Sequence, residues 1–179
     1  MRRLIQKSSI MMIIGLLVLP TSAAAQALQP TGATPVDRLQ ARCDTIRPLV
    51  RRLHTSDALL RVNIGQAYNS MSQRLMARLN SRLALSRLDS AQLVAITARF
   101  ETARTAFGAA YDEYEQALSA LTKIDCRQKP TDFYQQLLMA RDARHKVSKN
   151  VQNLNDIIND YRVAVETLQQ SMRSKDAPR

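Results

Sequence analysis

Apolar residues recur at alternating steps of four and three along most of the chain, and the pattern is clearest in the C-terminal third. Its positions there are Phe133, Leu137, Ala140, Arg144, Val147, Val151, Leu154, Ile158, Tyr161, Val165, Leu168 and Met172. A repeat of this spacing is typical of a helix that packs along one seam, as in a coiled coil. It predicts a helix over 132–173 in which Arg144 is the one charged seam residue.

A second repeat of the same kind precedes it. Its positions are Leu93, Ile96, Phe100, Ala103, Phe107, Ala110, Tyr114, Ala117, Leu121 and Ile124. The pattern predicts a helix over 90–125. Because alanines alternate with large residues in this seam, neighbouring backbones can approach closely.

The first repeat is regular and then changes its spacing. It runs through Val36, Leu39, Cys43, Ile46, Val50, Leu53, Asp57, Leu60, Ile64, Ala67 and Met71, and continues in steps of four through Leu75, Leu79 and Leu83. The change indicates a stutter in a helix over about 36–86. Pro48 removes a backbone donor and crowds the preceding turn, so we expect a bend near Arg47.

The two breaks between the repeats have the chemistry of helix starts. Before the second helix, Asp89 is the expected N-cap, Gln92 reaches back to it, and Leu88 packs on Leu93. Thr131 is the expected N-cap of the third helix.

Short connections between long helices make them antiparallel neighbours. The sequence therefore predicts an all-α fold: an elongated, antiparallel, up-down-up three-helix bundle of coiled-coil type over 36–173, followed by a disordered tail at 174–179. At 1.5 Å per residue the rod would be roughly 60–75 Å long.

The N-terminus has the three parts of a secretory signal peptide. The positive residues are Arg2, Arg3 and Lys7, followed by the apolar stretch 10–19 and the small residues 23–27. The prediction is a signal at 1–27, cleaved after Ala25 or Ala27, and a flexible linker at 28–35. The protein would then be secreted or extracytoplasmic, in the periplasm or at the cell surface, without a stable membrane span. The alternative is an anchor formed by an uncleaved N-terminal helix.

The two cysteines test the predicted topology. Cys43 and Cys126 have their midpoint at about residue 84, next to the expected turn, so folding the second helix back on the first brings both to one end. An exported chain with an even cysteine count favours a disulfide, which the chain-entropy model values at about 4–5 kcal/mol. The alternative is a pair of free buried thiols.

The same reasoning places Asp57 and Arg144 at one level of the bundle and predicts an internal ion pair. One interpretation is a register device, since a buried charge without a partner is costly. The other is a polar binding site that Asp112, Glu113 or Glu115 would join.

Charge is unevenly distributed along the chain. The 26 Lys and Arg exceed the 15 Asp and Glu, for a net charge of +11. Arg74, Arg78 and Arg82 form one stripe that leads to Arg87 at the predicted hairpin tip. Such a tip can attract phosphates, acidic polysaccharide, anionic lipid or nucleic acid; the alternative is a solvated basic face. Because the chain has no Trp for base stacking, nucleic acid is disfavoured, and sequence-specific binding is not expected.

Catalytic and cofactor motifs are missing from the sequence. The four glycines are not clustered, which excludes Rossmann and P-loop nucleotide sites. His54 and His145 belong to no metal-binding motif, and the helical pair Asp156 and Asp160 is interpreted as solvated. We therefore expect no enzyme, no cofactor and no metal site.

The chain resembles a group of uncharacterised exported helical proteins of candidate phyla radiation (Patescibacteria) bacteria. The features that carry the resemblance are Arg42-Cys43, Phe107, Tyr114, Asp125-Cys126, Pro130, Phe133, Leu137 and Ala140-Arg141. The resemblance implies export, a disulfide and three helices, and it implies no activity. The chain is also similar, through Leu88 and Gln92 alone, to small basic periplasmic chaperones of the LTxxQ type.

These observations predict an exported, non-enzymatic structural or interaction protein of the cell envelope. Its basic rod would contact a protein or an anionic envelope polymer. The alternative is a holdase-like extracytoplasmic chaperone, which would need a large exposed apolar surface. The pattern predicts no oligomeric state.

Overall fold

The computed structural model describes residues 32–176. The chain divides into two compact units, Met1–Gly32 and Ala33–Arg179, and the second is described by itself. The predicted signal and most of the linker therefore lie outside the described residues. Between residues 32 and 176 there is no strand, which confirms the all-α class.

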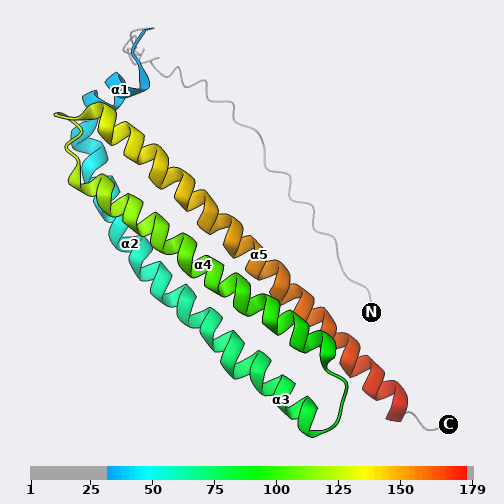
Figure 1. Cartoon of the computed structure of the whole chain (residues 1–179). Helices are drawn as coiled ribbons and strands as arrows, with labels where there is room; N and C mark the ends of the chain where they lie inside the picture. Colours follow the sequence, from blue (N-terminus) through cyan, green and yellow to red (C-terminus); the bar gives the residue numbers. More distant parts are fainter. Residues whose placement is uncertain (1–31, 177–179) are drawn as a thin grey trace, which may run out of the picture. The chain divides into compact units, whose positions relative to one another are not determined.

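The second unit consists of long helices joined by short turns (Figure 1). The first arm comprises α1 (Pro35–Ala41), α2 (Cys43–Ser70), the π-helical turn η1 (Met71–Met76) and α3 (Ala77–Leu85). It is followed by α4 (Ala91–Lys123) and α5 (Pro130–Asp176). Because α5 continues to Asp176, the predicted disordered tail is wrong for residues 174–176.

Cross-helix hydrogen bonds establish the direction of neighbouring helices. Residue numbers fall along α4 as they rise along the first arm, in the pairs His54–Glu115, Ser72–Glu101 and Asn80–Thr97. The same reversal relates α4 to α5, in the pairs Glu113–Lys146 and Arg99–Asp160. Each neighbouring pair is therefore antiparallel.

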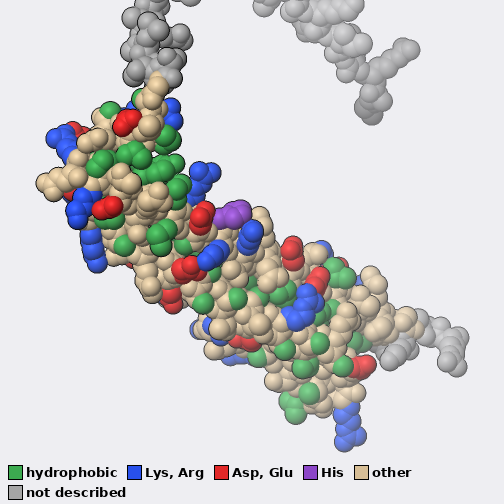
Figure 2. Space-filling model, turned by 45° about the horizontal axis from the view of Figure 1, so that its top comes forward, with side chains coloured by type: hydrophobic (Ala, Val, Ile, Leu, Met, Phe, Trp, Pro, Cys, Tyr) green, Lys and Arg blue, Asp and Glu red, His purple; other side chains and the backbone are tan. Residues whose placement is uncertain are grey.

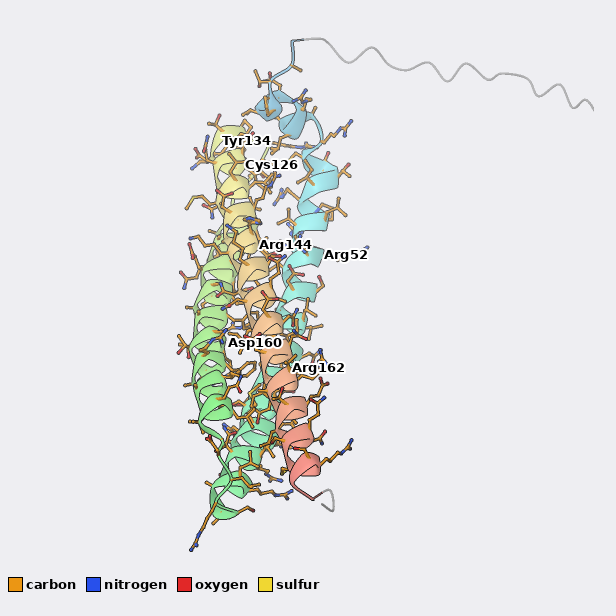
Figure 3. The ribbon with its side chains drawn as sticks, turned by 90° about the vertical axis from the view of Figure 1, so that its right-hand side faces the viewer. Arg52, Cys126, Tyr134, Arg144, Asp160 and Arg162 are labelled. Atoms are coloured by element: carbon orange, nitrogen blue, oxygen red, sulfur yellow. A yellow bond between two sulfur atoms is a disulfide. The ribbon has the colours of Figure 1, made fainter. Side chains whose placement is uncertain are left out.

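The predicted disulfide is confirmed. Cys43 opens α2 and Cys126 follows α4, and their Cα atoms are 5.7 Å apart in a bonded pair. Both residues are almost completely buried, at 1% and 0% exposure. The bridge attaches the first arm to the end of α4 (Figure 3).

Helices α4 and α5 pack closely through small residues. The buried alanines of these two helices are Ala103, Ala110, Ala140, Ala143 and Ala164. Cα atoms of α4 and α5 lie within 8 Å of each other, whereas no Cα atom of α2 comes within 8 Å of one in α5. The alanine seam of the second repeat therefore gives the close approach that its composition predicts.

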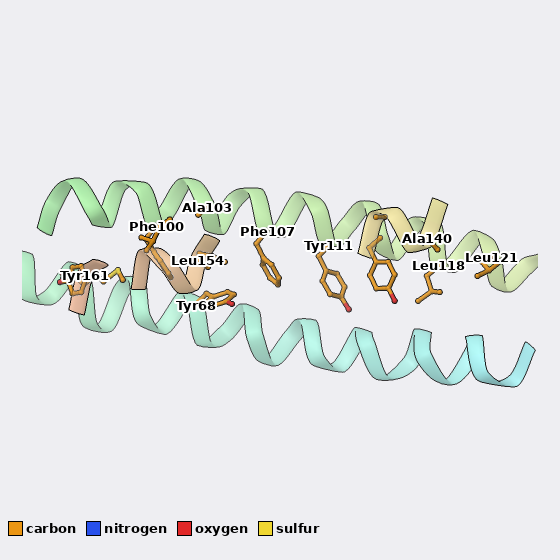
Figure 4. Packing of buried hydrophobic residues seen from close by; sticks show 14 of the residues in the cluster. Tyr68, Phe100, Ala103, Phe107, Tyr111, Leu118, Leu121, Ala140, Leu154 and Tyr161 are labelled. Atoms are coloured by element: carbon orange, nitrogen blue, oxygen red, sulfur yellow. Dashed lines mark hydrogen bonds between the residues drawn. The ribbon is translucent and has the colours of Figure 1, made fainter. Parts of the chain in front are cut away.

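The first arm packs on α4 through large aromatic rings instead (Figure 4). Tyr68 of α2 meets Phe100 and Phe107 edge-on, at centroid distances of 6.2 and 5.4 Å. The chain of rings continues from Phe107 to Tyr111 and from Tyr111 to Tyr114, at 6.1 and 5.8 Å. Edge-to-face contacts of this kind add to the stabilisation from burial.

The predicted seam of the first arm is shifted by one residue between Ile64 and Met76, and it returns to the predicted positions at Leu79 and Leu83. Tyr68, Ser72 and Met76 are buried, whereas the predicted seam residue Leu75 is 64% exposed. The steps of four that indicate a stutter thus begin at Ile64 rather than at Met71, and η1 contains two of their positions, Ser72 and Met76. The reason is Tyr68, whose ring fills space against α4 that a smaller side chain at Ala67 would leave empty.

Three helix boundaries also differ from the prediction. The first helix is interrupted at Arg42, with φ −106° and ψ 14°, and passes through Pro48 as part of α2. Ser90 is the N-cap of α4, although the oxygen that accepts from the Ala91 amide belongs to Asp89, at 3.1 Å. Helix α5 starts at Pro130, because proline is favoured at the first helical position, so Thr131 lies inside its first turn.

No helix within residues 32–176 has a stretch that is both long and apolar enough to cross a bilayer.

Candidate functional site

Asp57 is the centre of a polar cluster between the first arm and α4. The Tyr114 hydroxyl donates to Asp57 Oδ2 at 2.6 Å, and the Tyr111 hydroxyl donates to the Asp57 carbonyl. Arg144 Nε lies 3.9 Å from the same Oδ2. The structure therefore brings Asp57 and Arg144 together at the edge of ion-pair distance.

The pair is not internal, however. The Asp57 side chain is 13% exposed, but that of Arg144 is 60% exposed. Arg144 lies on the side of α5 that faces α2 (Figure 3), and its neighbour Ala143 is buried against the bundle instead. A long charged side chain keeps its head in water more cheaply than it enters a core, so the predicted burial of Arg144 is wrong.

The tyrosines of this cluster are held in their neutral, donating form. Burial, followed by the hydrogen bond to Asp57, raises the pKa of Tyr114 far above its usual range. Burial and the nearby Asp57 charge raise the pKa of Tyr111 as well. Asp57 therefore accepts from two tyrosine hydroxyls, one at its carboxylate and one at its backbone carbonyl.

The acidic run on α4 does not form a common site. Asp112 binds Arg61, Glu113 binds Lys146 at 2.6 Å, and Glu115 binds His54 at 2.5 Å. Its three carboxylates thus face three different partners. Within the part of the chain that the structure describes, no group of His, Cys, Asp and Glu could hold a metal ion.

A shallow groove of about 570 Å³ lies between α2 and α4. Gly65 and Gly108 line it, one from each helix, and a Cβ added to either would meet nothing within 4 Å. One oxygen of Glu115, which also lines the groove, is buried without a hydrogen-bond partner. The hydrophobic pattern does not predict this groove; the signal for it in the sequence is a pair of isolated glycines inside the predicted helices.

The π-helical turn carries a second polar contact that the sequence did not predict. Ser72, buried at 6% exposure, donates to Glu101, which also accepts from Arg104 at 2.7 and 3.0 Å. Burial by itself would raise the pKa of Glu101, but these hydrogen bonds outweigh it and hold the pKa below its usual value.

The predicted arginine stripe lies entirely on the surface. Arg74, Arg78, Arg82 and Arg87 are all exposed, and none of them forms an ion pair with a described carboxylate. At 100° per residue, Arg74 and Arg78 point away from Met76 and Leu83, which are buried. We call these four arginines, together with the end of α3, the basic tip.

The exposed apolar residues of α2 are interspersed with polar ones. Leu49, Leu59, Leu60 and Val62 are between 52% and 66% exposed. At 100° per residue they spread over about 160° of the helix surface. The exposed polar residues Arg52, Ser56 and Asn63 lie within the same arc, so the apolar residues do not form a continuous broad surface.

No family model matches the chain, and neither the curated proteins nor the solved structures contain a significant match. The resemblance to exported helical proteins therefore stays a prediction.

Proposed function

We propose that the protein is an exported, non-enzymatic interaction protein of the cell envelope, and that its basic tip contacts an anionic partner. The observation that carries the proposal is the contrast among its arginines. Arg47, Arg61, Arg99 and Arg127 each pair with a carboxylate, whereas the four arginines of the basic tip face solvent without one. Arg38, Arg51, Arg52 and Arg141 are also exposed without an ion pair, but they do not gather in one stripe at one end of the unit. Unpaired, clustered charge is available to an external anion.

The fold supports this proposal as a scaffold. The antiparallel pairing of the first arm, α4 and α5 supports an up-down-up, coiled-coil-like bundle. Such a bundle holds the basic tip at the end opposite the disulfide (Figure 1). The disulfide itself suits an oxidising compartment outside the cytoplasm.

The state of the carboxylates supports a role without catalysis. A general acid or base needs a carboxyl group whose pKa is shifted in a pocket. Asp112 and Glu113 of α4 instead form ion pairs with Arg61 and Lys146 on the neighbouring helices, and Glu115 contacts the His54 ring. Resident cofactors and metals have no part in the proposed function.

The test is a comparison of two triple charge reversals in the full chain, produced in an oxidising compartment. Arg74→Glu, Arg78→Glu and Arg82→Glu remove the basic tip. Arg38→Glu, Arg51→Glu and Arg52→Glu change the net charge equally at exposed positions nearer the disulfide. Retention on immobilised inorganic polyphosphate should be lost in the first variant and largely kept in the second. Equal losses in both would contradict a role for the basic tip.

The holdase alternative has its own measurement. A holdase suppresses the aggregation of a denatured client protein at near-equimolar ratio. Because exposed polar residues interrupt the apolar positions of α2, we expect no suppression. Suppression that disappears on changing Leu59 and Val62 to Ser would favour the chaperone over the interaction protein.

A further inference from the structure

The basic tip also contains an exposed apolar residue that does not pack in the core. Leu85, the last residue of α3, is 84% exposed, the highest value among the exposed large apolar side chains of the described residues. At 100° per residue it lies within about 20° of Arg78 on the outer side of α3, and Arg74 precedes both in the π-helical turn. A leucine thus projects from the end of the arginine stripe.

The way α3 ends does not require this leucine. The Leu88 amide donates to the Leu83 carbonyl at 3.0 Å, and the Arg87 amide donates to that of Ala84 at 3.1 Å. These bonds form a Schellman motif, whose usual apolar contact joins the residues at the positions of Leu83 and Leu88. Leu83 is buried and Leu88 packs against the core, so this contact is made without Leu85.

Arg87 occupies the one position of this motif that favours glycine. Its φ is 55°, the only positive φ at a non-glycine residue in the described part of the chain. A side chain at this position costs free energy that glycine would not. The tip thus has a fourth arginine where the backbone favours no side chain at all.

Acidic residues are scarce around these groups. Between residues 71 and 100 the only carboxylate is Asp89, which accepts from the Ala91 amide, against Arg74, Arg78, Arg82, Arg87 and Arg99. Figure 2 shows basic and hydrophobic side chains together at the end of the unit where α3 turns into α4. The surface is therefore cationic around an exposed apolar point.

We propose that the basic tip docks on the surface of an anionic lipid bilayer, with Leu85 entering the interface and the arginines contacting lipid phosphates. A soluble polyanion would use the arginines alone, whereas a lipid interface also takes the leucine. Arginine stems can lie along the apolar boundary while their heads stay at the phosphates. This inference rests on the proposed function, because it takes the anionic partner to be lipid.

The experiment uses a fluorescent reporter at the tip of the full chain. Because the sequence has no Trp, Leu85→Trp introduces a single one at the proposed contact. Leu59→Trp is the matched control, since Leu59 is 66% exposed on α2 and belongs to no arginine stripe. Both reporters are local, so binding through residues 1–31 would not imitate contact at the tip.

We expect vesicles of phosphatidylcholine mixed with phosphatidylglycerol to shift the emission of Leu85→Trp to the blue, and vesicles of phosphatidylcholine alone to leave it unchanged. Leu59→Trp should respond to neither. Each arginine of the tip replaced by Gln should lower partitioning about fivefold, and Arg74, Arg78 and Arg82 together about a hundredfold. Added salt should weaken binding as well.

A variant that stabilises the fold shows whether a loss of vesicle binding is caused by unfolding alone. Arg87→Gly should raise the thermal unfolding temperature and still lower partitioning about fivefold, because it relieves the backbone while removing one charge. A stabilised variant that binds vesicles as well as the original protein would contradict a role for Arg87 and weigh against the inference.

The remaining outcomes separate the inference from the proposed function. If anionic vesicles cause no shift while polyphosphate still binds through the same arginines, the lipid inference fails and the proposed function stands. If neither binds, both fail. An equal shift with neutral vesicles would overturn the inference, because contact would then not depend on charge.

Discussion

The two interfaces of α4 are built on different principles. Toward α5, alanines such as Ala143 and Ala164 let the backbones approach closely. Toward the first arm, α4 presents aromatic rings and polar groups: Phe107 and Tyr111 fill the space, and Glu101 and Glu115 hydrogen-bond across it. Of the first arm only α1 comes within 8 Å of α5 between Cα atoms, whereas α2, η1 and α3 do not, and a disulfide attaches one end of the arm to α4.

This difference indicates which part of the unit is scaffold and which part is free to carry function. The α4–α5 pair resembles a uniform hairpin with repeated small contacts. The first arm contains the irregular features: the break at Arg42, the π-helical turn, the groove at Gly65 and the basic tip. π-Helical turns often occur at functional sites, and the proposed contact surface belongs to the same arm.

The largest expected effect comes from removing the bridge that holds the first arm. Changing Cys43 and Cys126 to Ala should lower the free energy of unfolding by about 4–5 kcal/mol, because the unfolded chain regains the entropy of a long loop. Chemical denaturation measures this, and hydrogen exchange should show α2 opening before α4 and α5. Uniform loss of protection in all helices would contradict the distinction between the interfaces.

The aromatic interface should depend on its central ring. Phe107 is 4% exposed and contacts both Tyr68 and Tyr111. Phe107→Ala should lower the free energy of unfolding by about 3–5 kcal/mol through lost burial and the cavity left behind. Phe107→Leu is the control that keeps most of the apolar volume, and it should cost clearly less in the same denaturation experiment.

The alanine interface between α4 and α5 should be destabilised by added side-chain volume, whereas the aromatic interface is destabilised by removed volume. Ala143 is 3% exposed in α5, so Ala143→Leu should cost about 1–3 kcal/mol by forcing the helices apart. Ala106→Leu places the same side chain at an exposed position of α4 and should change stability by no more than about 0.5 kcal/mol. Equal effects at both positions would show that close approach is not required.

The groove glycines should prove dispensable for folding. Because an added Cβ meets nothing at Gly65 or Gly108, replacing either by Ala should stabilise the protein by about 1 kcal/mol through helix propensity. Thermal unfolding of each single variant measures this. Destabilisation would mean that the helices need to approach more closely there than the structure shows.

The smallest expected effect is the pH dependence of the stability that Glu101 contributes through its contact with the π-helical turn. The pKa of Glu101 is lowered below its ordinary 4.5, so the stability it contributes is present above that pH and is lost as the pH falls through the lower, folded value. The Glu101 side chain is 39% exposed, so screening limits the contribution to a few tenths of a kcal/mol. The stability difference between the original protein and Glu101→Gln should therefore disappear at low pH. A difference that is independent of pH would contradict this.

Much of the architecture could be predicted from local patterns. The seven-residue periodicity predicts long helices, and the mirrored positions of Cys43 and Cys126 predict the bridge that the structure contains. The exposed stripe of Arg74, Arg78 and Arg82 follows from their spacing of four on a helix whose opposite face is apolar. The helices and the stripe each depend on one segment, and the bridge depends only on helix length and the place of one turn, so the sequence is sufficient for them.

The choices that involve two helices at once could not be predicted in this way. Periodicity does not show whether Ala67 or Tyr68 faces α4 after a stutter, because the answer depends on the volume that Phe100 and Phe107 leave open. It also could not show that Arg144 would remain exposed, or that three adjacent carboxylates would find separate partners.

The sequence by itself thus determined the helical class and the surface position of the basic tip, since backbone hydrogen bonding and amphipathic spacing act within a single segment. It also determined the disulfide, because helix lengths and one turn place the two cysteines at the same end. Only the tertiary structure decided the register of the first arm between Ile64 and Met76, the groove at Gly65 and Gly108, and the projection of Leu85 beside the arginines. The physical reason is that packing is a property of pairs of surfaces: which side chain fills a space depends on what the facing helix leaves empty.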